Sequence, residues 1–215
     1  MQQFSIETIK TWERFYRANF INCLTGFKSV QLIATVNEQQ QPNLAIFNNV
    51  VHLGADPALI GFVNRPLAAA PHTLTNIEKT GIYTINHIHP SFVEKAHQTS
   101  AKYDADINEF EAVGLQMQYA NHLQVPFVAE SLVKYAMKLV EVVPLKHNNT
   151  FFVIGAITDV IIEEESIINT DGFLNVDEIN SVTSLGIDGY FSTKRLARYT
   201  YAKPNEPTKQ LEKEK

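Results

Sequence analysis

The chain has 215 residues, of which 45% are hydrophobic and 19% charged, a balance typical of a globular domain with a sizeable core. Its net charge of −5, without any stripe of Lys and Arg, argues against nucleic-acid binding, which needs clustered cations. The single cysteine, Cys23, leaves no internal disulfide and fits a reducing compartment. Because no signal-peptide pattern follows Met1 and no apolar run reaches the roughly 18 residues of a membrane helix, we expect a cytoplasmic protein without a membrane partner.

The first part of the chain predicts one helix followed by a strand. Apolar residues recur at helical spacing over residues 6–20, with Ser5 as the expected N-cap. Gly26 is the expected stop signal, and residues 30–36 are rich in the β-branched side chains typical of strands. A polar turn ending at Pro42 then reverses the chain, which favours antiparallel pairing.

The stretch over residues 43–57 is the most unusual part of the sequence. It carries Asn43, Asn48 and Asn49 between apolar residues, although asparagine is depleted in strand interiors because its amide competes with the backbone for hydrogen bonds. One interpretation is a bulged strand whose asparagine amides satisfy stray backbone groups. The other is that the stretch holds a flat, hydrogen-bonding cofactor. The residues alone leave both interpretations open.

Residues 58–99 predict short alternating strands and helices. A strand over 58–63 is followed by a loop over 64–73 that two prolines stiffen. Thr73 is placed to cap a helix over 74–80, which Gly81 would end. Two more elements are expected after it, a strand over 82–88 and a helix from about Pro90 to Thr99.

The remainder predicts one long hairpin among irregular segments. Residues 132–143 and 150–163 alternate as strands around a polar turn. Smaller features are a short helix over 109–113, loops over 171–188, and a last helix or strand over 190–202. We therefore expect one domain over residues 1–204 with an N-terminal helix, followed by a mobile charged tail over 205–215. The excess of strands favours a mainly β fold, antiparallel and closed, with flanking helices.

Familiar catalytic and metal sites are missing from the sequence. There is no P-loop, no Gly-x-Gly-x-x-Gly after a strand, and no serine in a nucleophile elbow. His87 and His89 would share one strand face with His97 nearby, but no carboxylate or cysteine completes a metal set. We accordingly predict neither a metal nor a catalytic side chain.

A group of polar residues is expected at strand ends and loop starts. Arg65, His72 and Thr73 would combine a guanidinium, an imidazole and a hydroxyl at a helix N-terminus, which together suit an anion. Ser100-Ala101-Lys102 adds a hydroxyl and a cation, and Lys28 precedes the first strand. A phosphate-bearing ligand needs two or three such donors at one end, and an isoalloxazine-like ring needs amides at the other.

An ordered series of short motifs spans residues 20–160. The motifs are Gly26-Phe27-Lys28, Asn43-Leu44-Ala45-Ile46-Phe47-Asn48-Asn49, Asp56-Pro57, Gly61-Phe62, Arg65-Pro66, Thr73-x-x-Asn76-Ile77, Gly81-x-Tyr83-Thr84-Ile85-Asn86, Ser100-Ala101-Lys102-Tyr103, Glu109-Phe110-Glu111-x-Val113-Gly114-Leu115 and Val128-x-Glu130-Ser131. No single motif is specific, but their order resembles the flavin reductase-like family with the FMN-binding split barrel, related to the flavoredoxins. The sequence departs from the family pattern at Asn48-Asn49 and at His72.

The resemblance implies a six-stranded antiparallel split β-barrel, a homodimer, and FMN near the subunit interface. It implies an NAD(P)H-dependent flavin oxidoreductase, which passes hydride from NADH or NADPH through FMN to free flavin, a partner monooxygenase or ferric iron. The expected FMN-binding residues are Lys28, Asn43, Leu44, Ala45, Ile46, Phe47, Asn48, Asn49, Arg65, His72, Thr73, Asn76, Ser100, Ala101 and Lys102. Three alternatives stay open: an FMN-binding electron carrier of the flavoredoxin type, a non-redox small-molecule-binding barrel, and a plain dimerisation domain.

Overall fold

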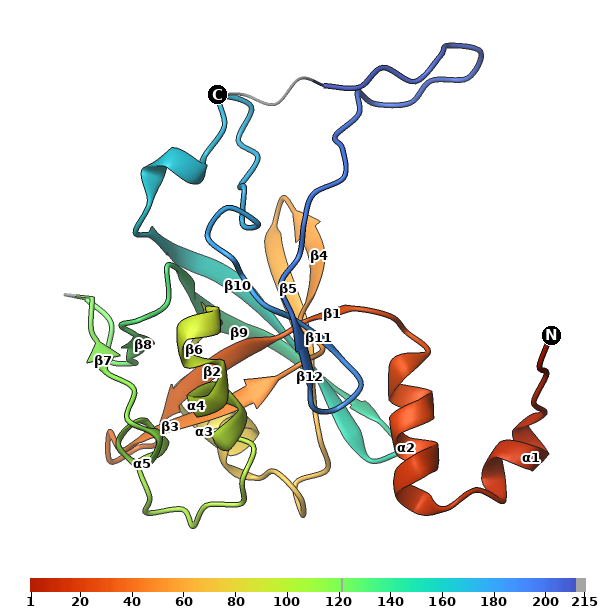
Figure 1. Ribbon diagram of the computed structural model, residues 1–215. Coiled ribbons are helices and arrows are strands. Elements are labelled where there is room, and N and C mark those ends of the chain that lie inside the picture. The colour runs from red at the N-terminus through yellow and green to blue at the C-terminus, as the bar shows by residue number, and fades with distance from the viewer. Residues whose placement is uncertain (121, 212–215) are drawn as a thin grey trace.

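One antiparallel seven-stranded sheet forms the centre of the computed structural model, which describes residues 1–120 and 122–211 (Figure 1). Its strands follow the order β3-β2-β6-β9-β10-β5-β4, so that β3 and β4 are the two edges. Their bounds are β2 (Gln31–Val36), β3 (Pro42–Phe47), β4 (Val51–Ala55), β5 (Ala58–Asn64), β6 (Ile82–His87), β9 (Val133–Leu145) and β10 (Thr150–Ile162).

The stretch over residues 43–57, for which one interpretation was a single bulged strand, contains two strands. β3 ends at Phe47 and β4 begins at Val51. Between them the amide of Asn49 bonds the backbone of Val63 in both directions, donating to its carbonyl at 3.1 Å and accepting from its N–H at 3.0 Å. This local pairing turns the chain and adds a seventh strand to the six that were expected.

The long hairpin β9–β10 is confirmed and connects the two halves of the sheet. β9 pairs with β6 on one side, and β10 pairs with β5 on the other. Two register shifts between β9 and β10 mark β-bulges, which bend and twist strands. Gly155 lies at one of them, and a Cβ there would overlap the hydroxyl of Tyr83, so the close approach requires glycine.

Two apolar layers bury the middle of the sheet on both faces. Successive side chains of a strand point to opposite faces, so Leu32 packs in one layer with Phe110, and Ile33 packs in the other with Phe62. All six residues of β2 are consequently buried. The second layer fills the barrel interior, while the first is covered by helices and loops.

Short helices flank the sheet, with α3, α4 and α5 gathered on one side and α1 and α2 extending away from it (Figure 1). They are α1 (Ile6–Lys10), α2 (Arg14–Cys23), α3 (His72–Thr80), α4 (Val93–Gln98) and α5 (Glu109–Val113), with 3-10 turns at Pro90–Phe92 and Glu165–Ile167. Ser5 caps α1 as predicted, but the single predicted N-terminal helix is two helices. Glu13 accepts hydrogen bonds from the N–H groups of Phe15 and Tyr16 and thereby starts α2. Gly81 ends α3 with a φ of 73°, as predicted.

The C-terminal part adds a second small sheet and an extended arm. β1 (Lys28–Ser29) pairs with β11 (Thr183–Leu185), which pairs with β12 (Gly189–Phe191). Thus the region predicted as loops contains a strand, and the last predicted helix or strand is only the three residues of β12. A third sheet joins β7 (Met117–Gln118) to β8 (Phe127–Val128).

Beyond β12 the arm folds back on itself, with Tyr199 bridged to Gln210. The prediction of a mobile tail falls partly on residues 212–215, which lie outside the described residues. Over residues 1–120 and 122–211, no helix combines the length and apolar character needed to cross a membrane.

Candidate functional site

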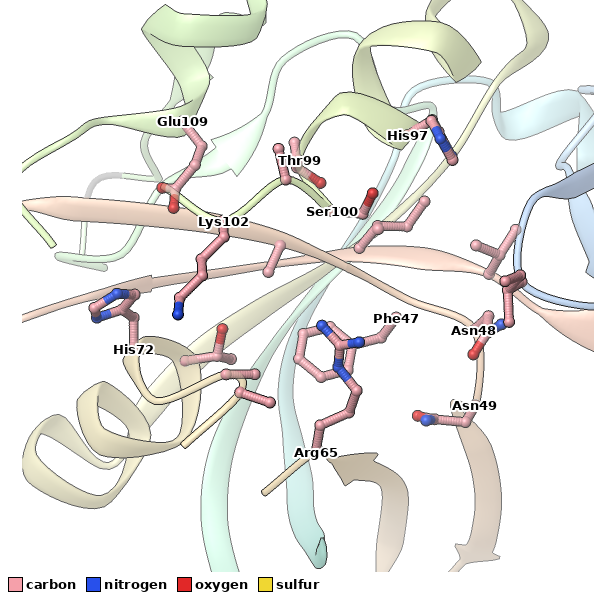
Figure 2. Close-up of a pocket in the computed structure, with 18 of the residues that line it drawn as sticks. Phe47, Asn48, Asn49, Arg65, His72, His97, Thr99, Ser100, Lys102 and Glu109 are labelled. Carbon is pink, nitrogen blue, oxygen red and sulfur yellow. The ribbon is translucent and has the colours of Figure 1, made fainter. Parts of the chain in front are cut away.

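A cleft of about 900 Å³ lies between the sheet edge and the surrounding loops (Figure 2). Four parts of the chain wall it: the end of β3 with the Asn48–Asn49 turn, the loop from Arg65 into α3, the segment after α4, and the turn between β11 and β12. Its volume falls in the upper part of the range of small-molecule sites, roughly 300–1,000 Å³.

One end of the cleft is cationic. His72 and Lys102 lie together at this end, Asn48 and His97 lie at the opposite end, and Arg65 lies between (Figure 2). Within residues 1–120 and 122–211, no carboxylate forms an ion pair with Arg65 or Lys102. Two unpaired cations in a concave site favour an anionic ligand.

The N-terminus of α3 adds to this cationic end. The helix starts at His72 behind Pro71, and no side chain of the described residues caps it. Its first N–H groups therefore keep their hydrogen-bonding capacity and the positive end of the helix dipole. The buried Thr73 in this first turn also lines the cleft, with its hydroxyl bonded to the Asn43 amide at 3.2 Å.

The free edge of β3 presents backbone groups to the cleft. β3 pairs only with β2 in the sheet, so alternate residues turn their N–H and C=O groups outward. The outward N–H of Leu44 donates to Glu109 Oε2 at 3.0 Å. The same alternation turns the backbone groups of Ile46 outward, and Ile46 lines the cleft.

Glu109 is a cleft residue that the sequence analysis missed. Its carboxylate is buried and extends into the same part of the cleft as Lys102 (Figure 2). Burial raises the pKa of Glu109, although the hydrogen bond from Leu44 and the nearby His72 oppose the shift. A negative charge among cations limits how strongly this end attracts anions.

All three asparagines hydrogen-bond groups of the protein itself, as the bulged-strand interpretation expects, and the cofactor interpretation stays open because they also face the cleft. Asn49 satisfies backbone groups of Val63, and the buried Asn43 donates to the hydroxyls of Thr35 and Thr73. Asn48 also bonds a backbone group, since its amide nitrogen donates to the carbonyl of Gly186, 138 residues away, at 3.2 Å. All three nevertheless line the cleft.

Most of the predicted FMN-binding residues come together on the wall of the cleft. Those lining it are Asn43, Ala45, Ile46, Phe47, Asn48, Asn49, Arg65, His72, Thr73, Ser100, Ala101 and Lys102. The structure places Lys28, Leu44 and Asn76 away from the cleft wall. Lys28 instead donates to the carbonyls of Asn22 and Gly186, and Asn76 donates to the Thr35 hydroxyl.

Comparison with known proteins decides the family. The family model described as flavin reductase like domain matches residues 25–174, more than half of the chain. The chain belongs to the flavin reductase-like family. The resemblance seen in the ordered motifs is confirmed.

Solved structures agree with the fold of this flavin reductase-like protein. A protein from Shewanella frigidimarina NCIMB 400, assigned as a flavin reductase with a split barrel domain, is 48% identical with a TM-score of 0.90, covering 94% of this chain and 100% of that one. Component B of nitrilotriacetate monooxygenase from Bacillus cereus is 16% identical with a TM-score of 0.80, covering 92% and 98% of the two chains. Flavoredoxin of Desulfovibrio vulgaris (Miyazaki F) is 20% identical with a TM-score of 0.71, covering 82% and 92%. At such identities the last two establish a shared fold alone, and the predicted mainly β split-barrel class is confirmed.

Proposed function

We propose that this flavin reductase-like protein binds FMN and passes hydride from NADH or NADPH to an acceptor such as free flavin, a partner monooxygenase or ferric iron. The observation that carries the proposal is the pairing of a cationic end with an exposed strand edge in one cleft. FMN has a dianionic phosphate at one end and a ring edge that needs hydrogen-bond partners at the other.

The residues of the cleft fit FMN on both counts. Arg65, Lys102 and the uncapped start of α3 supply charge and N–H donors for a phosphate. The outward backbone of Ile46 supplies a donor and an acceptor for a ring edge, and the buried ring of Phe47 supplies an apolar surface. Bound there, FMN supplies the hydride-accepting ring, a chemistry that no side chain of the protein provides.

The protein's own residues orient the ligand, stabilise charge on it and exclude water from it. The strand edge is rigid because β2 is buried on both faces, so it orients a ligand at a small entropic cost. Cations near the ligand stabilise negative charge that develops on reduction. No side chain has to act as a general acid or base in a direct hydride transfer.

The choice of acceptor rests on relatives with the same fold. Component B of a monooxygenase supports transfer to a partner enzyme, and the flavoredoxin supports an electron carrier with little NAD(P)H activity as the second candidate. Both candidates use the same cleft.

One experiment tests FMN binding and separates the two candidates. FMN is added to the purified protein, free flavin is removed, and the absorption spectrum is taken before and after anaerobic NADH or NADPH. We expect a flavin band that bleaches within seconds, and turnover with added free FMN. A bound flavin that NAD(P)H does not bleach indicates the carrier, and a protein that retains no flavin contradicts the proposal.

We also propose that the protein is a homodimer, because large apolar side chains on α2 and beside β12 are exposed. α2 has no buried residue, and Phe15 is 67% exposed. Phe27, 61% exposed, forms an edge-to-face pair with Phe191 on β12. Exposed apolar side chains of this size favour a partner surface, and a second copy is the simplest one. Light scattering is expected to give twice the mass of one chain, and a monomer mass contradicts the dimer.

A further inference from the structure

The loop over residues 65–70 connects β5 to α3 and forms one wall of the cleft. Arg65 extends from the end of β5 into the cleft (Figure 2). The other lining residues of this wall are Ala68, Ala69, Ala70, Pro71, His72 and Thr73. The conformation of the 65–70 loop therefore sets where the guanidinium of Arg65 and the first N–H groups of α3 lie.

Asn64, the last residue of β5, holds both ends of this loop. Its side-chain nitrogen donates to the carbonyl of Arg65 at 2.8 Å and to the carbonyl of Ala70 at 3.2 Å. An asparagine NH₂ group has two hydrogens, so each carbonyl receives one of them. The two carbonyls belong to the first and last residues of the loop. Because Asn64 also pairs with Phe151 of β10, the loop is closed against a strand of the main sheet.

The loop is also ordered from within. The N–H groups of Ala69 and Ala70 both donate to the carbonyl of Pro66, at 2.8 and 3.1 Å. The rings of Pro66 and Pro71 fix the φ angles at both sides of this turn. A turn that is stiff inside and fastened at both ends moves as one unit, so the two bonds of Asn64 decide where that unit sits.

Asn64 acts on a ligand only through the loop. Its side chain is 0% exposed and lies behind the cleft wall rather than in it. Its Oδ1 has no hydrogen-bond partner among residues 1–120 and 122–211, and an unsatisfied buried acceptor costs free energy. Local stability is therefore a weak reason for an asparagine here, whereas closing the loop requires a buried group with two donors.

We propose that Asn64 is a positioning residue for recognition of the anionic group of the ligand. Its amide closes the 65–70 loop and thereby fixes Arg65 and the start of α3 in the cleft. The inference rests on the proposed function in that the anion is the phosphate of FMN. Donors that are fixed in advance lose little conformational entropy on binding, so an open loop binds the phosphate more weakly and leaves binding of the ring unchanged.

FMN and riboflavin are the probes that test the proposal, because they share the ring and the ribityl chain and differ in the phosphate. Equilibrium dialysis measures the affinity of each flavin for the wild type and for Asn64→Ala. We expect the wild type to bind FMN at least tenfold more tightly than riboflavin. Asn64→Ala should weaken FMN binding at least fivefold and leave riboflavin within twofold. Equal weakening of both flavins, or an unchanged FMN affinity, overturns the proposal.

Arg65→Ala tests whether Asn64 acts through the loop. Residues that act through one another have non-additive effects, so the double variant should lose at least threefold less FMN affinity than the product of the two single losses. Displacing a cation from the phosphate also lowers the salt dependence of binding. We expect this decrease in both single variants. Additive losses together with wild-type salt dependence in Asn64→Ala overturn the proposal.

A matched control is Asn175→Ala, which removes a buried asparagine elsewhere. Asn175 is 4% exposed, its amide nitrogen donates to the carbonyl of Ile167 at 3.1 Å, and it does not line the cleft. The preference of this variant for FMN over riboflavin should equal that of the wild type. A preference lowered as much as in Asn64→Ala would show a general effect of losing a buried amide, and it overturns the proposal.

Two further measurements do not depend on the folding of Asn64→Ala. Asn64→Leu fills a similar volume without a donor and should lose the preference for FMN to the same extent, and a retained preference overturns the proposal. In the flavin-free wild type, the amides of Ala69 and Ala70 should exchange with solvent at least tenfold more slowly than those of an unstructured peptide. Unprotected amides at both positions contradict a closed loop.

A wild type that binds neither flavin contradicts the proposed function alone. Inorganic phosphate is then the probe, and the amide NMR shifts of Ala70 and His72 report its binding. We expect Asn64→Ala to weaken phosphate binding at least threefold. Equal phosphate affinities of the two proteins, or no phosphate binding by the wild type, overturn the role of Asn64.

Discussion

Glu109 places a buried carboxylate beside the cations of the cleft, and its charge opposes a phosphate. In Glu109→Gln the amide oxygen still accepts from the Leu44 N–H, but the charge is gone. We expect FMN to bind roughly three- to tenfold more tightly, equivalent to about 1 kcal/mol of removed repulsion. Equilibrium dialysis at neutral pH measures the change.

The pH dependence adds a second test of Glu109. The pKa of Glu109 is raised, so in the wild type the carboxylate is neutralised as the pH falls through that raised value. The FMN affinity of the wild type then increases relative to that of the Glu109→Gln variant. The difference between wild type and Glu109→Gln should therefore shrink at low pH. A constant difference contradicts a direct charge effect.

Asn48 and Asn49 are adjacent and yet have different roles. Asn49→Ala removes both bonds to the Val63 backbone and is expected to lower the free energy of unfolding by about 1–3 kcal/mol. Urea denaturation of the flavin-free protein measures it. Asn48→Ala is the matched control, since it loses one bond to Gly186. An equal loss of stability in the two variants would contradict the division of roles.

At the scale of elements, Lys28 links the end of α2 to the hairpin of β11 and β12, residues 183–191. Its ammonium donates to Asn22 and Gly186, so Lys28→Met is expected to loosen residues 183–191. Amide hydrogen exchange of these residues should become at least fivefold faster, while exchange in β9 stays unchanged. FMN affinity should fall less than threefold, because Lys28 does not line the cleft. A larger loss of FMN affinity would indicate that Lys28 contributes to the flavin site.

Periodic elements were predictable, and elements set by single side chains or distant pairing were not. The long strands β9 and β10 and the glycine end of α3 follow from alternation and from Gly81. The break after α1 depends on the two capping hydrogen bonds that the Glu13 side chain accepts, which the helical pattern hides. β11 has only three residues, and its partner β1 is far away in the sequence, so it carries no local signal.

The residues of the candidate site were likewise predictable where they follow a local pattern and unpredictable where distant contacts place them. Side chains near the strand edge and the start of α3 were found because they interrupt or cap predicted elements. Glu109 was read as part of a short helix, and its bond to Leu44, 65 residues away, has no sequence pattern. Ser184 fell in a region predicted as loops and Tyr190 at the start of a predicted last helix or strand, so only the folded chain brings them to the cleft.

For the whole molecule, His87 makes stability depend on pH. Burial lowers the pKa of His87 from 6.5 to about 4, and its ring bonds Ser181 at 2.9 Å. The unfolded chain therefore binds a proton at His87 more readily than the folded chain does. The contribution of neutral His87 to the free energy of unfolding is fully present above pH 6.5 and is lost as the pH falls toward 4. We expect His87→Gln to reduce the decrease in the free energy of unfolding between neutral and mildly acidic pH by about 1–3 kcal/mol. Urea midpoints at mildly acidic and neutral pH measure it, and parallel curves for the two proteins contradict it.

The contact between Asn48 and Gly186 joins positions 138 residues apart. During synthesis, a nascent chain that has emerged only as far as β10 lacks the part of the cleft wall that the turn between β11 and β12 supplies. We therefore expect binding of the proposed flavin to be one of the last events in maturation. The flavin colour would then report that the Asn48 turn and the turn between β11 and β12 have come together.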